Sequence, residues 1–384
     1  MPRDRGFSLI ELIVATGLTV VVAGMVFALV QPAQGRFDTE LEVADMQQRL
    51  RVAVDTLTRD LATAGAGAYA GGHAGPLIHY FAPVLPFRQG LSGDDAPGTF
   101  RTDTITIISV PATAAQTTLS ADLTPGSLTM QAEPGPACPA GTNLCGFAAG
   151  MTVVVYDETG NVDGFTIAAV SDASAQLTLT ARPTDSIGTT YARGSTIVEA
   201  RVRTYYLKVD TSQLMRADGS ANPDVPVVDH VVGLVFAYDG EPRPPGLRAD
   251  GGTSYGPAPP ALEAKPTAYP AGENCAFRID DSGEPAARLP ALNLDAALTP
   301  LNGAQFVDGP WCPDDTNANR WDADLLRIRR VVVTVRVEAA LAALRGPAGA
   351  LFANGGSSRA ANRYAPDQEI RFQVSPPNMT LGRQ

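Results

Sequence analysis

The 384-residue chain lacks two short motifs that mark common enzyme classes. It has no Walker-type glycine-rich loop and no His-Glu-x-x-His motif. Scattered Asp, Ser and His residues are expected by chance in a chain of this length, and ordinary surface or packing histidines explain His79 and His230. We therefore expect a protein that is not an enzyme.

Clustered basic residues are also missing. The formal net charge is −11, and no run of Lys or Arg interleaved with aromatic residues occurs. Proteins that bind the phosphate backbone of nucleic acids use clustered cations for it. We therefore expect no nucleic-acid partner for the folded part of the chain.

Cysteine is scarce, and its spacing does not fit a zinc site. The four cysteines include no Cys-x-x-Cys pair, and the three histidines are scattered. An even number of cysteines within loop-like sequence is typical of disulfides in an oxidising compartment. Four cysteines allow three pairings. We predict the one that joins neighbours in sequence, Cys138 with Cys145 and Cys275 with Cys312.

One long apolar run is present, at residues 7–30, and it contains a single acid, Glu11. As a helix it would be about 36 Å long, enough for a hydrocarbon core of about 30 Å. Arg3 and Arg5 precede the run and predict a cytoplasmic N-terminus. A charge inside a membrane helix costs roughly 2.5–3.5 kcal/mol on insertion scales, so we expect Glu11 to have a partner.

Two simpler interpretations of this segment leave Glu11 unexplained. A secretory signal peptide has a shorter apolar core, followed by a cleavage site of small residues. A plain signal anchor accounts for the length and for the arginines, but not for an acid beside Gly6 and Phe7. If a peptidase cut after Gly6, the new amine of Phe7 would lie one helical turn from Glu11, in the same chain or in a neighbouring copy.

Residues 6–11, Gly-Phe-Ser-Leu-Ile-Glu, resemble the prepilin peptidase site of type IV prepilins. The resemblance implies cleavage between Gly6 and Phe7, N-methylation of Phe7, and a role for Glu11 in subunit assembly. It implies a single-pass inner-membrane protein that later passes through the periplasm into an extracellular pilus. The implied partners are prepilin peptidase, the inner-membrane assembly platform, other major and minor pilins, and membrane lipid before assembly.

The sequence after the apolar run keeps a helical pattern. Pro32 is expected to kink the helix or to mark its exit from the bilayer, and Gly65 is expected to help end it. Apolar residues recur every three or four positions, which predicts a face that packs on a sheet. These are Val43, Met46, Leu50, Val54, Leu57 and Leu61, with Glu42, Gln47, Arg51, Asp55 and Arg59 mostly off the stripe.

Parts of this second half resemble the minor pilins of the PilW family. The similar residues are 47–55, 59–61 (Arg-Asp-Leu) and 64–65 (Ala-Gly), followed by three strand-like segments at 202–207, 228–238 and 328–337. The J-type pseudopilins of type II secretion share the same outline. The resemblance implies a minor pilin of a type IV pilus, and leaves the J-type pseudopilin as an alternative.

The rest of the chain predicts a β-rich head, so the expected fold class is α+β. We expect a long N-terminal helix, half in the membrane and half amphipathic, packed on an antiparallel sheet. Turn residues at 157–161 and 172–174 predict hairpins. Strand-like runs occur at 104–110, 151–156, 164–170, 177–180, 196–209, 225–238, 326–337 and 370–374.

The expected parts are a leader (1–6), a transmembrane and assembly helix (7–31), an amphipathic helix half (32–65) and a periplasmic or extracellular head (66–384). Within the head we expect an inserted β subdomain at 118–200 and a Pro/Gly-rich elaboration at 239–324. The elaboration holds 13 of the 31 prolines, which excludes regular strands through most of it. Loops of this length are usually functional or partly disordered, and a fibre-tip adhesive surface is a further alternative.

One acidic stretch is a candidate for calcium. Oxygen-bearing side chains at alternating positions can surround a hard cation, but the glycine and the final Glu of an EF-hand loop are missing. A solvated polar turn explains the same residues, and we predict no metal and no other cofactor. The calcium alternative would use Asp315, Asn317, Asn319, Asp322 and Asp324.

Overall fold

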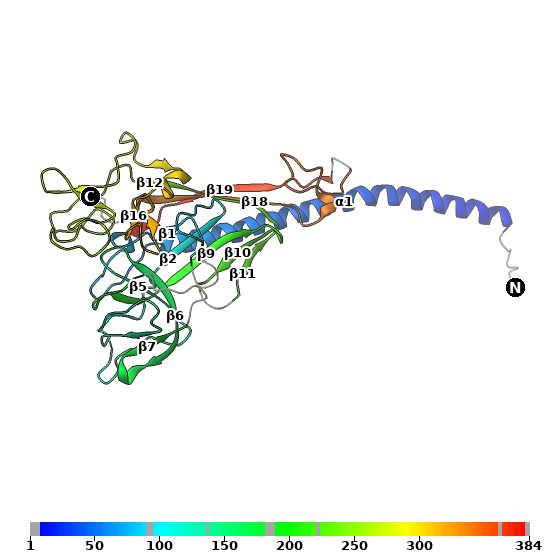
Figure 1. Cartoon of the computed structure of the whole chain (residues 1–384). Coiled ribbons are helices and arrows are strands. Elements are labelled where there is room, and N and C mark those ends of the chain that lie inside the picture. The colour runs from blue at the N-terminus through cyan, green and yellow to red at the C-terminus, as the bar shows by residue number, and fades with distance from the viewer. Residues whose placement is uncertain are drawn as a thin grey trace. The chain divides into compact units, whose positions relative to one another are not determined.

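The computed structural model describes residues 8–89, 95–135, 138–180, 189–219, 223–359 and 363–380, without the side chains of 29–36. The chain divides into two compact units. One contains residues 1–51 and 336–369; the other, the globular unit, contains 52–335 and 370–384. A long helix followed by antiparallel sheets confirms the predicted α+β class (Figure 1).

Helix α1 spans Leu9–Thr63, so the α-helix does not end at Pro32. Its stretch Leu9–Ala28 is long and apolar enough to cross a membrane, by length and composition. The helix stops just before Gly65, whose φ of +76° is the left-handed conformation that glycine adopts without strain. The predicted helix end is thus confirmed. Directly after it, the Gly65 N–H donates to the Ile108 carbonyl (3.1 Å).

A five-stranded antiparallel sheet lies against the last turns of α1. Its order is β1-β2-β9-β10-β11. On the helix, Leu57 and Leu61 are fully buried, as the apolar stripe predicts, and so is Ala53, which lies outside the predicted stripe. The strands are β1 (Val84–Leu85), β2 (Thr104–Ser109), β9 (Arg201–Lys208), β10 (Gln213–Ala217) and β11 (Val225–Asp229).

The chain between β2 and β9 forms a six-stranded sheet of order β3-β8-β5-β6-β7-β4 with its own apolar core. The predicted hairpins are present, since β5 pairs with β6 around residues 157–161 and β6 pairs with β7 around 172–174. The strands are β3 (Gln116–Thr118), β4 (Thr129–Gln131), β5 (Thr152–Tyr156), β6 (Val162–Ser171), β7 (Gln176–Leu179) and β8 (Thr196–Glu199).

Two predicted runs each divide into two strands of different sheets. The run 196–209 breaks at Ala200, between β8 of the subdomain and β9 of the five-stranded sheet. The run 225–238 breaks at His230, whose φ of +57° turns the chain from β11 into β12 (Val231–Gly240). Strand β12 belongs to a four-stranded sheet of order β15-β12-β18-β19, with β15 (Thr299–Leu301), β18 (Ile328–Val337) and β19 (Gln368–Val374).

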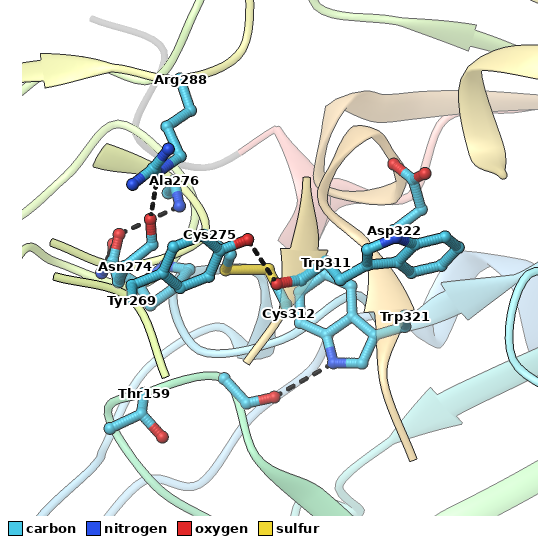
Figure 2. Close-up of a disulfide and its surroundings, with 12 residues drawn as sticks. Thr159, Tyr269, Asn274, Cys275, Ala276, Arg288, Trp311, Cys312, Trp321 and Asp322 are labelled. Carbon is cyan, nitrogen blue, oxygen red and sulfur yellow. Dashed lines mark hydrogen bonds between the residues drawn. A yellow bond between two sulfur atoms is a disulfide. The ribbon is translucent and has the colours of Figure 1, made fainter. Parts of the chain in front are cut away.

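The elaboration at 239–324 is mostly irregular, as predicted, but its described residues are packed. The disulfide Cys275–Cys312 has both cysteines fully buried, with Cα atoms 5.1 Å apart. Around it the Tyr269 hydroxyl donates to the Trp311 carbonyl (3.0 Å) (Figure 2). Its short elements are β13 (Phe277–Ile279), β14 (Pro285–Ala287), β15, β16 (Trp311–Cys312), β17 (Trp321–Asp322), η3 (Gly303–Phe306) and η4 (Ala323–Arg327).

Candidate functional site

The described chain begins at Ser8, so the predicted processing residues Gly6 and Phe7 lie outside the described residues. Ser8 caps α1. Its hydroxyl oxygen accepts from the Glu11 N–H (3.2 Å), while Glu11 Oε2 accepts from the Ser8 N–H (2.9 Å) and the Ser8 hydroxyl (3.0 Å). This reciprocal pair is a capping box, which satisfies backbone donors that the first turn of a helix leaves unpaired.

The capping box gives Glu11 a structural role that the sequence interpretation missed. The signal was present, because Ser-x-x-Glu before an apolar helix is the sequence pattern of a capping box. The carboxylate is held toward the N-terminal end of α1, which is the end that Phe7 precedes. A negative charge there is also favoured by the helix dipole.

Glu42 departs from its expected place off the apolar stripe, because it is only 7% exposed. Its Oε1 accepts from the Ala340 N–H, and Arg49 lies 3.8 Å away. Arg49 also donates to the Glu338 carbonyl (3.4 Å), and the Glu338 carboxylate pairs with Arg345 (2.9 Å). A buried carboxylate is tolerated when such donors compensate it. No local pattern reveals this network, because its helix residues and the residues around Ala340 are about 300 positions apart in sequence.

Asp60 joins the end of α1 to the five-stranded sheet. Its carboxylate, 6% exposed, pairs with Arg203 and accepts from the Tyr205 hydroxyl, both on β9. Burial, followed by the nearby Asp60, raises the pKa of Tyr205 well above its usual range. Tyr205 therefore stays a neutral donor at physiological pH.

The five calcium candidates do not form one ligand set among the described residues. Asn317 donates to the Asn161 side-chain oxygen (3.0 Å), and its own oxygen accepts from the Asn319 N–H (2.8 Å). Asn319 donates to Asp163 on β6, and Asp315 is exposed. The asparagines thus tie the elaboration to the β5–β6 hairpin. The predicted polar turn accounts for them better than a cation loop does.

The other two candidates meet a residue that the sequence interpretation missed. The side-chain oxygens of Asp308, Asp322 and Asp324 lie within 4.8 Å of one another. Burial and the neighbouring carboxylates raise the pKa of Asp322 to about 7. Burial also raises the pKa of Asp324 to about 6, although Arg327, 2.6 Å away, opposes the shift. The spacing of Asp308 in sequence gives no signal, because the chain must fold back to bring it close.

We expect Asp308→Asn to stabilise the globular unit by about 0.5–1 kcal/mol at pH 8 and by less at pH 5. The folded pKa values of Asp322 and Asp324 lie above the ordinary Asp value of 3.8. The folded state therefore binds more protons between these pH values, and stability falls as pH rises through this window. Removing the third charge relieves repulsion only where the other two are ionised. Denaturant unfolding at both pH values measures the difference.

The matched control is Asp315→Asn, an exposed carboxylate outside the cluster. It should change stability equally little at both pH values. Equal stabilisation by Asp308→Asn at pH 5 and pH 8 would contradict the repulsion. The same unfolding curves with calcium or with a chelator test the calcium alternative, and an unchanged transition would remove it.

Comparison with known proteins finds a match for the N-terminal segment of the chain. Residues 1–27 match the model of the prokaryotic N-terminal methylation motif. No curated protein and no solved structure matches the chain. This motif is typical of type IV pilin-like and pseudopilin-like proteins, which are processed at the motif and assemble with other pilins. The apolar helix of the chain is consistent with a membrane-anchored precursor, and such subunits are typically structural rather than enzymatic.

Proposed function

We propose that the chain is a PilW-like minor pilin, a structural subunit of a type IV pilus that takes part in pilus assembly. The observation that carries the proposal is the match of residues 1–27 to the methylation motif, with Glu11 inside an apolar helix. In this proposal residues 1–6 are a leader, 7–31 the assembly helix, 32–65 its amphipathic half and 66–384 the exported head.

Assembly would follow from a charge pair made by cleavage. After the cut between Gly6 and Phe7, Glu11 takes the new amine of a neighbouring subunit's Phe7. In an apolar environment an unpaired charge is heavily penalised, so the pair fixes the axial register of one helix against the next. Similar subunits that meet head to tail, by a rotation that does not close, form an open helical fibre.

The test separates the charge of Glu11 from its capping role. Glu11→Gln keeps an oxygen that can accept from Ser8 but removes the charge. We expect it to reduce incorporation into pili at least about tenfold, because the neighbour's amine loses its partner. Immunoblots of sheared pili, normalised to the membrane fraction, measure incorporation. N-terminal sequencing checks that the variant protein still begins at Phe7.

Ser8→Ala is the matched control, because it removes the hydroxyl from the capping box and keeps the carboxylate. The lost cap costs about 1 kcal/mol of helix stability, so incorporation should stay within about twofold. Normal incorporation of Glu11→Gln would defeat the charge pair. Replacing Gly6 by a larger residue should instead retain the leader.

The main alternative is a J-type pseudopilin of a type II secretion system, which would use the same motif and the same helix. Deleting the gene distinguishes the two. Loss of pili supports the minor pilin, whereas loss of exported enzymes with pili intact supports the pseudopilin. A fibre-tip adhesin or partner-binding pilin is a second alternative, and the packed, disulfide-linked elaboration favours it.

A further inference from the structure

A cavity of about 490 Å³ lies in the globular unit, and nothing in the proposed assembly uses it. Its walls come from the end of η1 (Leu77–His79), the turn of the β5–β6 hairpin, and loops at 248–274 of the elaboration. Cavities of roughly 300–1,000 Å³ are typical of small-molecule sites. The elaboration therefore builds a recess rather than only covering the sheets.

The walls of the cavity are held in place by internal hydrogen bonds. The buried Asn274 donates to the carbonyls of Pro257 (3.2 Å) and Ala258 (2.7 Å), and it directly precedes the disulfide residue Cys275. The Gly256 N–H donates to the Ile78 carbonyl (2.8 Å), which joins the loop to η1. Figure 2 shows Asn274 beside the disulfide and Thr159 on the hairpin turn. A site with such support is largely formed before a ligand arrives.

The charged side chains that line the cavity have partners. Arg248 lies 3.7 Å from Asp250, and Glu158 lies 3.5 Å from His73. Burial, then the positive charges of Arg248 and Arg329, lower the pKa of His79 below its ordinary value. His79 is therefore a neutral imidazole at pH 7, which can both donate and accept a hydrogen bond. Of the lining side chains Arg248 is cationic, whereas Asp250 and Glu158 are anionic, so a strongly anionic ligand has little advantage.

The lining also offers flat apolar surfaces next to these polar groups. Tyr80, whose ring also packs against His73 and Tyr156, lines the cavity, and Pro259, Pro260 and Pro266 add three rigid pyrrolidine rings. The imidazole, the carboxylates and the guanidinium lie around the same space. A ligand that fits this mixture has an apolar C–H face and an edge of neutral hydroxyl groups. A sugar ring has both.

From this lining we propose that the cavity binds a neutral saccharide of one or two rings, with a sugar face on Tyr80 and the prolines and its hydroxyls on His79, Arg248 and Asp250. The site is a binding site and involves no covalent step. It does not depend on whether the chain enters a pilus or a pseudopilus.

The experiment titrates the full-length protein with sugars by saturation-transfer NMR and calorimetry. A detergent without a sugar headgroup is needed, because a maltoside would compete for the site. The probes are glucose, galactose, N-acetylglucosamine and lactose, beside the anion glucuronate and a tetraproline peptide. We expect at least one neutral sugar to bind. Tyr80→Ala and Arg248→Ala should each weaken that binding at least about tenfold.

Arg278→Ala is the matched control, because Arg278 is an exposed arginine of the same elaboration that does not line the cavity. It should leave affinity within about twofold, and unfolding curves verify that all variants fold. Three outcomes would overturn the proposal: no neutral sugar binds, only glucuronate or tetraproline binds, or the cavity variants bind as the native protein does. Incorporation of Tyr80→Ala into pili should be unchanged, so failure of this site and failure of the assembly proposal are distinguishable.

Discussion

Replacing both Cys275 and Cys312 by serine should lower the free energy of unfolding of the globular unit by about 4 kcal/mol. The disulfide closes a loop with a sequence separation of 37 residues. Such a link removes conformational entropy from the unfolded chain, and the effect grows with loop length. The elaboration has few regular strands to hold it, so this covalent link is its main constraint on unfolding.

The contacts around this disulfide indicate which probe would detect the loss of stability. The Arg288 guanidinium donates to the Asn274 carbonyl (2.7 Å), and the Trp321 indole N–H donates to the Gly160 carbonyl (3.0 Å). The chain's two tryptophans lie on the paired strands β16 and β17, where Trp311 is opposite Asp322 and Trp321 is opposite Cys312. Tryptophan fluorescence during denaturant unfolding, with the full-length protein in detergent, therefore reports on this region directly.

The second disulfide provides the comparison. Cys138 and Cys145 are separated by only 7 residues, so their replacement should cost about 2 kcal/mol. The structure has both bridges in the predicted pairing. Equal losses from the two double variants would contradict the dependence on loop length, and no loss at Cys275 and Cys312 would show that packing alone holds the elaboration.

The features that the sequence predicts well are those set by local pattern. The three- and four-residue spacing of Met46, Leu50, Leu57 and Leu61 matches their burial on α1. The end of the helix at Gly65 is predictable because it depends on the left-handed backbone conformation of this one glycine and on no distant residue. The hairpin at 157–161 follows in the same way, since Asp157 accepts from the N–H groups of Thr159 and Asn161 within its own turn.

The features that the sequence predicts poorly depend on residues that are distant from one another along the chain. Ala200 lies inside an apolar run without glycine or proline, and in the second run Pro226 and Gly233 do not coincide with the break at His230. Periodicity alone therefore does not reveal that a strand changes sheets at either position. The burial of Glu42 depends on Ala340, and the pKa of Asp322 depends in part on Asp308. The saccharide cavity is of the same kind, because three separate segments form it. Function at the N-terminus was predictable because the whole motif is contiguous.

Asp60→Ala should destabilise the globular unit by about 3 kcal/mol. Removing one partner of a buried ion pair typically costs roughly 3–5 kcal/mol, since the other partner is left uncompensated. Here the loss is at the low end, because the Arg203 side chain is 29% exposed and also lies 3.4 Å from Asp218. The Tyr205 hydroxyl, on a fully buried residue, would lose its acceptor. Denaturant unfolding of the full-length variant measures the change.

A double-mutant cycle distinguishes this pairing from a general defect at the end of the helix. Tyr205→Phe alone should cost roughly 1.5–3 kcal/mol, and in the Asp60→Ala background it should cost much less, because the hydroxyl then has no charged acceptor to lose. Asp55→Ala, an exposed carboxylate on the same helix, should change stability by less than about 0.5 kcal/mol. Additive effects of Asp60→Ala and Tyr205→Phe would contradict a direct bond. Coupling between them would show that α1 is joined to β9 by this carboxylate, and that the Asp of the Arg-Asp-Leu sequence fixes the end of the helix on the sheet.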